Sequence, residues 1–364
     1  MESRAKYIPE LDGLRGIAVL MVIFHHISQN VYGFTSEGFS GRAVKLWLRI
    51  TTPGWMGVDI FFVLSGFLIT GVLMDAKGRP HFYRNFYMKR ILRIFPLYYL
   101  TLLLMLPFYA WPWSFFGLCT IYLANVSTLF RVPMVLAPLW SLSVEEHFYF
   151  VWPWVVRFLN IRAIFIAAIA LCLLEPAFRY FAFQHGFFDP YFSWFRLDGL
   201  ACGALLAIAV RHQSALSMKL WGSILCGTAI GVFFASLPYG GGSRLDAVGT
   251  AFLYSCISLF TGGIVSFLVA HSPYSAFSIL RTRSLRFIGD ISFCLYLVHM
   301  FVLDGFHRSI HAVFHREWFG GVVHNQIVAY FIFASFVFLI CLTLGTLSRD
   351  YFEGPIRHHR VRFE

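Results

Sequence analysis

Apolar segments of membrane-spanning length follow one another along almost the whole chain. A transmembrane α-helix needs about 20 mostly apolar residues, and eleven such segments can be marked out: Leu14–Val31, Trp55–Met74, Ile94–Trp111, Ser114–Leu129, Leu139–Leu159, Ala163–Phe181, Ser193–Val210, Leu220–Leu237, Ala247–Ala270, Leu285–Phe306 and Val323–Leu347. Only 13% of the residues are charged, against roughly 25% in soluble proteins. The sequence therefore predicts an all-α, polytopic transmembrane helix bundle, with residues 1–364 forming a single domain.

The distribution of cations predicts how the bundle is oriented. The stretch Lys77–Arg93 carries several cations and no acid, and the tail from Arg349 onward is also basic. Because cytoplasmic loops are enriched in Lys and Arg, both termini are predicted to be cytoplasmic, which requires an even number of crossings. The shortest segment, Ser114–Leu129, has prolines on both sides. We therefore expect about ten spanning helices, with residues 112–138 forming an external re-entrant or interfacial segment. The net charge of +11 is then a feature of the loops and does not indicate nucleic acid.

Ionisable residues inside the first apolar segment need an explanation, because such groups are costly in hydrocarbon. Arg15 and His26 are eleven positions apart, so they share a helix face and lie about 16 Å apart along the axis. Arg15 is predicted at the cytoplasmic end and His26 toward the outer side. His25 points about 100° away from His26, and a structural role is expected for it.

The predicted directions of the helices sort the other polar residues into two clusters. Arg15, Arg90 and Arg93 form a basic cytoplasmic cluster, and Arg90 and Arg93 share a helix face. The second cluster lies in the outer half of the membrane and contains His26, Asp59, Glu145, Arg196, Asp198 and His299, with Ser143 at a similar depth. Glu145 and its neighbour Glu146 point to different faces, so at most one is expected in any one pocket. Ser65 is placed near mid-membrane.

These clusters suggest a long substrate with a phosphate-rich head. Arginines suit a polyanion, and histidine among carboxylates suits general acid–base chemistry. Acyl-coenzyme A would place its head among the cytoplasmic arginines and its thioester near His26. On charge alone, however, the arginines are also explained as positive-inside residues, and Arg196 with Asp198 as an internal ion pair.

Six sequence motifs, in order, resemble those of the acyltransferase-3 family of bacterial integral-membrane O-acyltransferases, and together they cover nearly the whole chain. They are Arg15-x10-His26, "FFVLSGFLIT" with Ser65, "RILRIFPLYY" with Arg90 and Arg93, "WSLSVEEHFYFVWP" with Trp140 and Glu145, "IGDISFCLYLVH" ending at His299, and "YFEGPIR" near the C-terminus. The chain departs from the family at His147, where glutamine is common, and this difference bears on acceptor choice.

The resemblance implies an enzyme of the bacterial inner membrane that moves an acyl group, most often acetyl from acetyl-CoA, to a hydroxyl of a glycan, a lipid-linked sugar or a small glycosylated molecule. His26 would be the general base and Glu145 its orienting or acidic partner. Arg15, Arg90, Arg93 and Ser65 would bind the donor. Asp59, Trp140, Ser143, Arg196, Asp198 and His299 would contact substrate or support the site. The family's extra hydrolase-like domain is not expected here.

Several alternatives stay open at the level of sequence. The choice of Glu145 over Glu146 rests on the motif alone, and an acyl-enzyme on His26 or a serine competes with direct transfer. Ser65 and Gly66 are equally explained as small residues for close helix packing. A transporter or flippase of a lipid-linked glycan is the rival function, because buried charges also mark transport paths. No metal is expected, and the oligomeric state is left open.

Overall fold

The computed structural model describes residues 7–29, 42–108, 112–270, 277–314 and 326–356, and this part of the chain contains helices and no strand. The α-helices are α1 (Pro9–Gln29), α2 (Arg42–Thr51), α3 (Gly57–Ala76), α4 (Phe82–Met105), α5 (Trp113–Thr120), α6 (Leu139–Phe158), α7 (Ile161–Gln184), α8 (Leu197–His212), α9 (Ala215–Ser236), α10 (Ala247–Ala270), α11 (Arg283–Asp290), α12 (Ser292–Phe314) and α14 (Gln326–Leu347). Short 3₁₀ turns join several of them, and a π-helical turn (Ser348–Glu353) follows α14.

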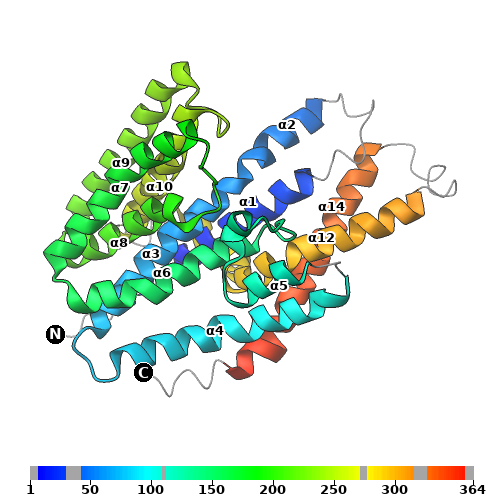
Figure 1. Ribbon diagram of the computed structural model, residues 1–364, viewed down its shortest axis with the longest axis horizontal. Coiled ribbons are helices and arrows are strands. Elements are labelled where there is room, and N and C mark those ends of the chain that lie inside the picture. The colour runs from blue at the N-terminus through cyan, green and yellow to red at the C-terminus, as the bar shows by residue number, and fades with distance from the viewer. Residues whose placement is uncertain (1–6, 30–41, 109–111, 271–276, 315–325, 357–364) are drawn as a thin grey trace.

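The helices form two groups on either side of a central layer (Figure 1). Helices α7, α8, α9 and α10 pack together on one side, and α4, α5, α12 and α14 lie on the other. Between them run α1, α3 and α6. Helix α3 packs against α8, α10 and α6, and α1 packs against α3, α11 and α12. The residues predicted to act are concentrated in this central layer.

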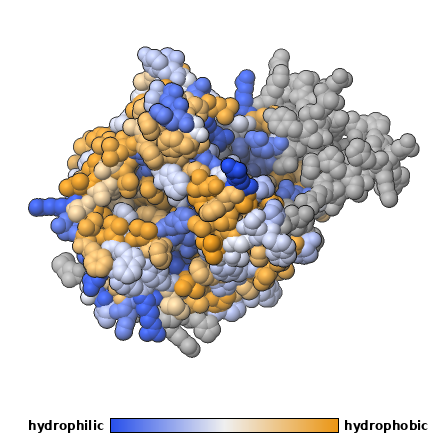
Figure 2. All heavy atoms as spheres, viewed as in Figure 1, coloured by the Kyte–Doolittle hydropathy of each residue, from blue (hydrophilic) through white to orange (hydrophobic). Residues whose placement is uncertain are grey.

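Six stretches of the described chain are long and apolar enough to cross a membrane: Pro9–Gln29, Leu46–Ala76, Ile161–Gln184, Ala215–Tyr239, Ala247–Ala270 and Phe331–Ile356. A seventh is added if α11 and α12 count as one broken span. These helices indicate a multi-pass membrane protein. Large apolar side chains are accordingly exposed on the outer helices, such as Ile166 on α7 and Leu220 on α9, and apolar residues cover much of the face seen in Figure 2.

Helices also occupy the remaining segments for which a crossing was predicted. Helices α4 and α6 carry several charged residues, and α8 has only 16 residues, so these three are not among the stretches above. They are also the helices that supply Arg90, Arg93, Glu145 and Asp198. The polar groups of the site thus lower the apolar signal of the helices that bear them, and the number of ten crossings stays a prediction.

The segment 112–138 contains no long helix among its residues. Helix α5 has eight residues and rises about 12 Å, which is too short to cross a hydrocarbon core of about 30 Å. The hydroxyls of Tyr98 and Tyr99 on α4 donate to the carbonyls of Cys119 and Thr120, each at 2.8 Å. These bonds satisfy carbonyl groups at the end of α5 and fix the segment over α4.

The segment predicted as one helix over Leu285–Phe306 is broken, so that prediction is wrong. Helices α11 and α12 meet at an angle of 73° after Asp290. Helix α11 lies against the beginning of α1, where a Cβ on Gly289 would come 2.0 Å from the carbonyl oxygen of Asp12. Glycine at position 289 thus permits a close backbone contact between α11 and α1, next to the bend.

The two ends of the described chain meet on α11. Arg286 donates to Tyr7 near the N-terminus at 3.2 Å, and Asp290 pairs with Arg349 after α14 at 2.6 Å. Both ends therefore lie at the same end of the bundle, as an even number of crossings requires. Arg15 and Arg93 are electrostatic neighbours there; we call this the cationic end.

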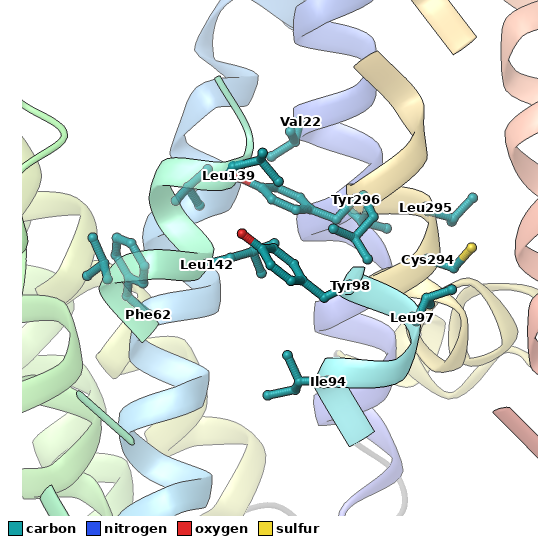
Figure 3. Close-up of a cluster of buried hydrophobic side chains, with 14 of the residues drawn as sticks. Val22, Phe62, Ile94, Leu97, Tyr98, Leu139, Leu142, Cys294, Leu295 and Tyr296 are labelled. Carbon is teal, nitrogen blue, oxygen red and sulfur yellow. The ribbon is translucent and has the colours of Figure 1, made fainter. Parts of the chain in front are cut away.

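The core joins the central layer to α4 and α12. Figure 3 shows side chains of this core from five helices, among them Val22 (α1), Phe62 (α3), Tyr98 (α4), Leu142 (α6) and Tyr296 (α12). All five belong to one continuous cluster of buried apolar residues. This core fixes the helices whose polar side chains line the site described next.

Candidate active site

A cavity opens between α1, α3, α4, α6 and α12, and we call it the central cavity. Its polar lining consists of Arg15, Ser65, Arg90, Arg93, Ser141, Glu145, Glu146, Tyr149, Ser292 and Tyr296. Five of the residues predicted from the sequence to form the site line this cavity: Arg15, Ser65, Arg90, Arg93 and Glu145. Arg90 is also stacked on the ring of Tyr149, with its guanidinium carbon 5.3 Å from the ring centre.

Glu145 accepts hydrogen bonds from two other residues of this polar lining. Its Oε1 accepts a hydrogen bond from Ser65 Oγ at 2.7 Å, and its Oε2 accepts one from Tyr149 at 3.2 Å. Arg15 and Arg93 are its charged neighbours. Hydrogen bonds to a carboxylate are about twice as strong as neutral ones, so this set holds the side chain in one orientation.

Glu145 was predicted as the partner of His26, and the contacts that the structure gives for Glu145 lie beside another part of α1. The two oxygens of Glu145 accept hydrogen bonds from Ser65 and Tyr149, and its charged neighbours include Arg15 and Arg93. Glu145 belongs to the level of Arg15, and His26 lies three helical turns away along α1. The pairing of Glu145 with His26, which the family resemblance implied, stays a prediction.

The expectation that only one of Glu145 and Glu146 faces a given pocket is wrong. Both line the central cavity, and Glu146 has Arg90 as a charged neighbour. The cavity extends from α3 across α6 to α4, so residues about 100° apart on α6 both reach it.

His26 pairs with His299, a residue that the sequence had also placed in the outer half of the membrane. His26 Nδ1 lies 3.2 Å from His299 Nε2 and 3.0 Å from the carbonyl oxygen of Val22. His299 Nδ1 lies 2.8 Å from the carbonyl oxygen of Tyr296. Since a carbonyl can only accept, the hydrogen-bond network assigns a proton to Nδ1 of each neutral ring. His26 Nε2 is then the nitrogen that carries a lone pair.

Tyr296 connects the histidine pair to the central cavity. Its carbonyl binds His299, its ring centre lies 5.6 Å from that of His299, and its hydroxyl lies 2.6 Å from Ser141 Oγ in the cavity wall. Three residues of the cavity lining were not predicted from the sequence: Tyr149, Ser141 and Tyr296. Tyr296 falls three residues before His299 in the same motif, which was the available signal.

The buried acids and arginines of the outer half pair differently from the predicted pattern. Arg196 pairs with Asp59 at 2.8 Å, and Asp198 pairs with Arg179 at 2.8 Å, so Arg196 and Asp198 are not each other's partners. Arg179 also contacts Glu175 at 3.3 Å. The i, i+4 spacing of Glu175 and Arg179 in an apolar segment was a signal for this pair that the sequence analysis did not use.

The remaining predicted residues lie outside the central cavity. The ring of Trp140 is packed beside the guanidinium of Arg196, 5.4 Å from its carbon. Ser143 donates to the carbonyl of Leu139 in its own helix at 3.0 Å. His147 Nδ1 lies 2.6 Å from Ser193 Oγ, and His25 is buried beside Gly54. Ser143 therefore has a helix-internal bond and no place in the cavity wall.

A second cavity continues from the central one toward the cationic end, and we call it the cationic cavity. Both cavities are lined by Arg90 and Arg93, and the cationic cavity adds Arg79, Asn85 and Lys89, with no acid among its lining residues. Four cations without a carboxylate fit a polyanion. Among the residues that the structure describes, no group of three or more His, Cys, Asp or Glu side chains is arranged to hold a metal ion.

Comparison with known proteins assigns the class of this fold and site. A family model described as "Acyltransferase domain" matches residues 8–346, so the chain belongs to this acyltransferase family. No solved structure matches the chain.

The curated relatives carry the names of O-acetyltransferases. The chain is 28% identical to a putative peptidoglycan O-acetyltransferase, YrhL, of Bacillus subtilis, over 98% of this chain and 56% of that protein. It is 28% identical to the peptidoglycan O-acetyltransferase OatA of Listeria monocytogenes, over 81% of this chain and 49% of OatA. A putative O-acetyltransferase of Staphylococcus aureus is 28% identical over 99% of this chain and 59% of that protein. The chain thus spans between 49% and 59% of the length of these relatives.

Proposed function

We propose that this protein transfers an acetyl group from acetyl-CoA to a hydroxyl group of a cell-surface glycan. The observation that carries the proposal is the arrangement of a cationic cavity, a central cavity and a histidine pair in succession along the central layer. The names of the relatives support a carbohydrate acceptor.

The donor head is proposed to bind where the two cavities join. Arg90 and Arg93 line both cavities and would contact the phosphates, with Arg79 and Lys89 beside them. Arg15 and the Ser65–Glu145 pair would then bind the amide-containing arm of the donor further along the central cavity. This assignment places the cationic end in the cytoplasm, where acetyl-CoA is made, and the protein in the bacterial inner membrane.

His26 is proposed as the general base. Its Nε2 would take the proton of the acceptor hydroxyl as the oxygen attacks the thioester carbonyl, and the thiolate of coenzyme A would leave. Glu145 is assigned to donor binding, because Ser65 and Tyr149 occupy its oxygens. The carbonyl of Val22 and Nε2 of His299 both face Nδ1–H of His26, and in this tautomer Nε2 of His26 carries the lone pair that would accept the proton.

The test is acetyl transfer by the purified full-length protein in lipid nanodiscs. Radiolabelled acetyl-CoA is supplied with chitotetraose or with muramidase-released peptidoglycan fragments, and labelled product is counted. His26→Ala should reduce the rate by about a hundred- to ten-thousand-fold, the usual contribution of a general base. The neighbouring His25→Gln, on another face of α1, is the matched control and should retain the rate.

Two outcomes would contradict the proposal. Wild-type protein that moves the glycan across the bilayer without acetylating it would favour the transporter reading. Equal losses of acetyl-transfer rate in His26→Ala and His25→Gln, at equal amounts of folded protein, would show that His26 is not the general base.

A further inference from the structure

A cluster of alternating guanidinium groups and aromatic rings surrounds the first turn of α3, at the end opposite the cationic end. Arg196 lies 4.1 Å from the ring centre of Tyr254 and 5.4 Å from that of Trp140. Trp140 packs against Tyr191 with ring centres 5.2 Å apart, and Tyr254 packs against Trp55 at 5.6 Å. We call this set the Arg196 cluster.

Arg244 extends the cluster to the surface. Its guanidinium carbon lies 4.1 Å above the ring of Trp55, and the residue is exposed. Tyr191 has both Arg244 and Arg196 as charged neighbours, which places it between them. The cluster therefore reaches from a solvent-accessible cation to a buried one through rings that are themselves partly exposed at Trp55, Trp140 and Tyr191.

The buried ion pair in this cluster is incompletely bonded. Arg196 Nη2 contacts Asp59 Oδ1 at 2.8 Å, and only 3% and 4% of the two side chains are exposed. Arg196 Nε and Nη1 and Asp59 Oδ2 are buried, with no hydrogen-bond partner among the described residues. Buried polar atoms are almost always hydrogen-bonded, so two donors and one acceptor in one place require an explanation.

A hydroxyl group matches this set of atoms. It accepts a hydrogen bond from a guanidinium N–H and donates one to a carboxylate oxygen, which neither a carboxylate nor an ammonium ligand does. The surrounding rings of Trp55, Trp140 and Tyr254 suit a ligand with flat C–H faces, because the negative face of an aromatic ring attracts weakly positive hydrogens. Sugars combine both features.

The cluster adjoins the central cavity. Phe62 lines that cavity and lies under Arg196, 5.6 Å from its guanidinium carbon. Trp140 is followed directly by Ser141, which contacts Tyr296 in the cavity wall. A ligand held at the cluster would therefore lie next to the outer part of the proposed reaction path.

We propose that the Arg196 cluster is a binding site for the sugar units of a carbohydrate acceptor. This inference deepens the proposed function by naming where the acceptor binds and which of its groups are recognised. A sugar hydroxyl would bridge Arg196 and Asp59, while Trp55, Trp140 and Tyr191 pack against the sugar rings and Arg244 binds at the surface.

The test measures binding alone, without an acyl donor. Chitotetraose and cellotetraose are titrated into the purified full-length protein in detergent micelles, and heat is measured by calorimetry. Arg244→Gln and Tyr191→Ala, both at accessible positions, should each raise the Kd by about threefold to tenfold, in keeping with the loss of one stacked or cationic contact. Trp194→Ala, an exposed tryptophan outside the cluster, is the matched control and should stay within about twofold of wild type.

The outcomes separate this inference from the proposed function. Saturable binding that weakens only in the cluster variants supports the site, even if no acetyl transfer is seen. Absence of binding by either sugar, equal effects in all three variants, or normal binding in both cluster variants would overturn it and leave ordered water as the partner of Arg196 and Asp59. Acetyl transfer with an unchanged KM for the acceptor in both cluster variants would also overturn it, while leaving the proposed function intact.

Discussion

At the scale of single residues, two backbone carbonyls decide where the protons of the histidine pair lie. The carbonyls of Val22 and Tyr296 face Nδ1 of His26 and His299. Each can only accept, so His299 presents a lone pair on Nε2 to the Nδ1–H of His26. His299 therefore acts on the reaction only by positioning His26, in the proposed mechanism.

A change at His299 should lower turnover without weakening donor binding. His299→Ala removes one of the two acceptors for the His26 Nδ1–H, leaving the carbonyl of Val22, and is expected to reduce kcat by about tenfold, less than the full contribution of a general base. The KM for acetyl-CoA should stay the same, because the donor-binding side chains are untouched. His299→Gln keeps an acceptor oxygen and should recover most of the rate. Steady-state kinetics check this, and an equal loss for both variants would contradict it.

At the scale of elements, the contact between α3 and α8 depends on two glycines. A Cβ on Gly66 would come 2.0 Å from the carbonyl oxygen of Leu200, and one on Gly203 would come 2.1 Å from that of Val63. Close packing of backbones through small residues is common between membrane helices. From the sequence, Ser65 and Gly66 were explained equally well by helix packing and by substrate contact. In the structure Gly66 packs against α8, and Ser65 faces the central cavity.

Adding one methyl group at Gly66 should destabilise the bundle. Gly66→Ala forces α3 away from the α8 backbone, and we expect a loss of about 1–3 kcal/mol, as for other overpacked interiors. Gly227→Ala on α9 is the control, since nothing lies within 4 Å of its Cβ position. That substitution should be neutral or stabilise by about 0.5–1 kcal/mol. Thermal unfolding in detergent measures both, and equal midpoints would contradict the predicted contact.

At the scale of the whole molecule, the two ends of the described chain and the cationic cavity share one end of the bundle. The contacts of Arg286 with Tyr7 and of Arg349 with Asp290 hold both chain ends to α11. Lys77 Nζ donates to the carbonyl of Leu159 at 2.6 Å, which joins the turn before α4 to the end of α6. The segment 112–138 connects the other ends of α4 and α6.

Cysteine labelling in intact cells should therefore separate the two ends of the bundle. Arg84→Cys and Leu129→Cys are both at exposed positions. A membrane-impermeant maleimide should label Leu129→Cys in intact spheroplasts, and Arg84→Cys only after permeabilisation. The unmodified chain, whose described cysteines are buried or half-buried, gives the background. Labelling of both variants from one side would overturn the ten-crossing topology.

The helices and the shared location of the three arginines are predicted from the sequence more readily than the pairings between side chains. Apolar length located nearly every helix, and the predicted helix directions grouped Arg15, Arg90 and Arg93, which the central cavity also brings together. They placed Glu145 in the other cluster, whereas it lines the same cavity. The sequence alone could not give the partner of His26, because partner choice depends on the relative depth and rotation of helices far apart in the sequence. The bend after Asp290 likewise lies next to the contact of Gly289 with α1, which no local pattern reports.

The buried network around Arg179 and Arg196 bears on how the chain enters the bilayer during synthesis. Helix α7 brings Glu175 and Arg179, and α8 begins beside Arg196 and Asp198. A lone charged residue near the centre of an inserting helix costs about 2.5–3.5 kcal/mol. Helix α7 already pairs Arg179 with Glu175 one turn earlier, whereas Asp198, in the first turn of α8, gains Arg179 as a partner only when the two helices pack together. We therefore expect Asp198 to favour insertion of α8 next to α7, where Arg179 is available to pair with it.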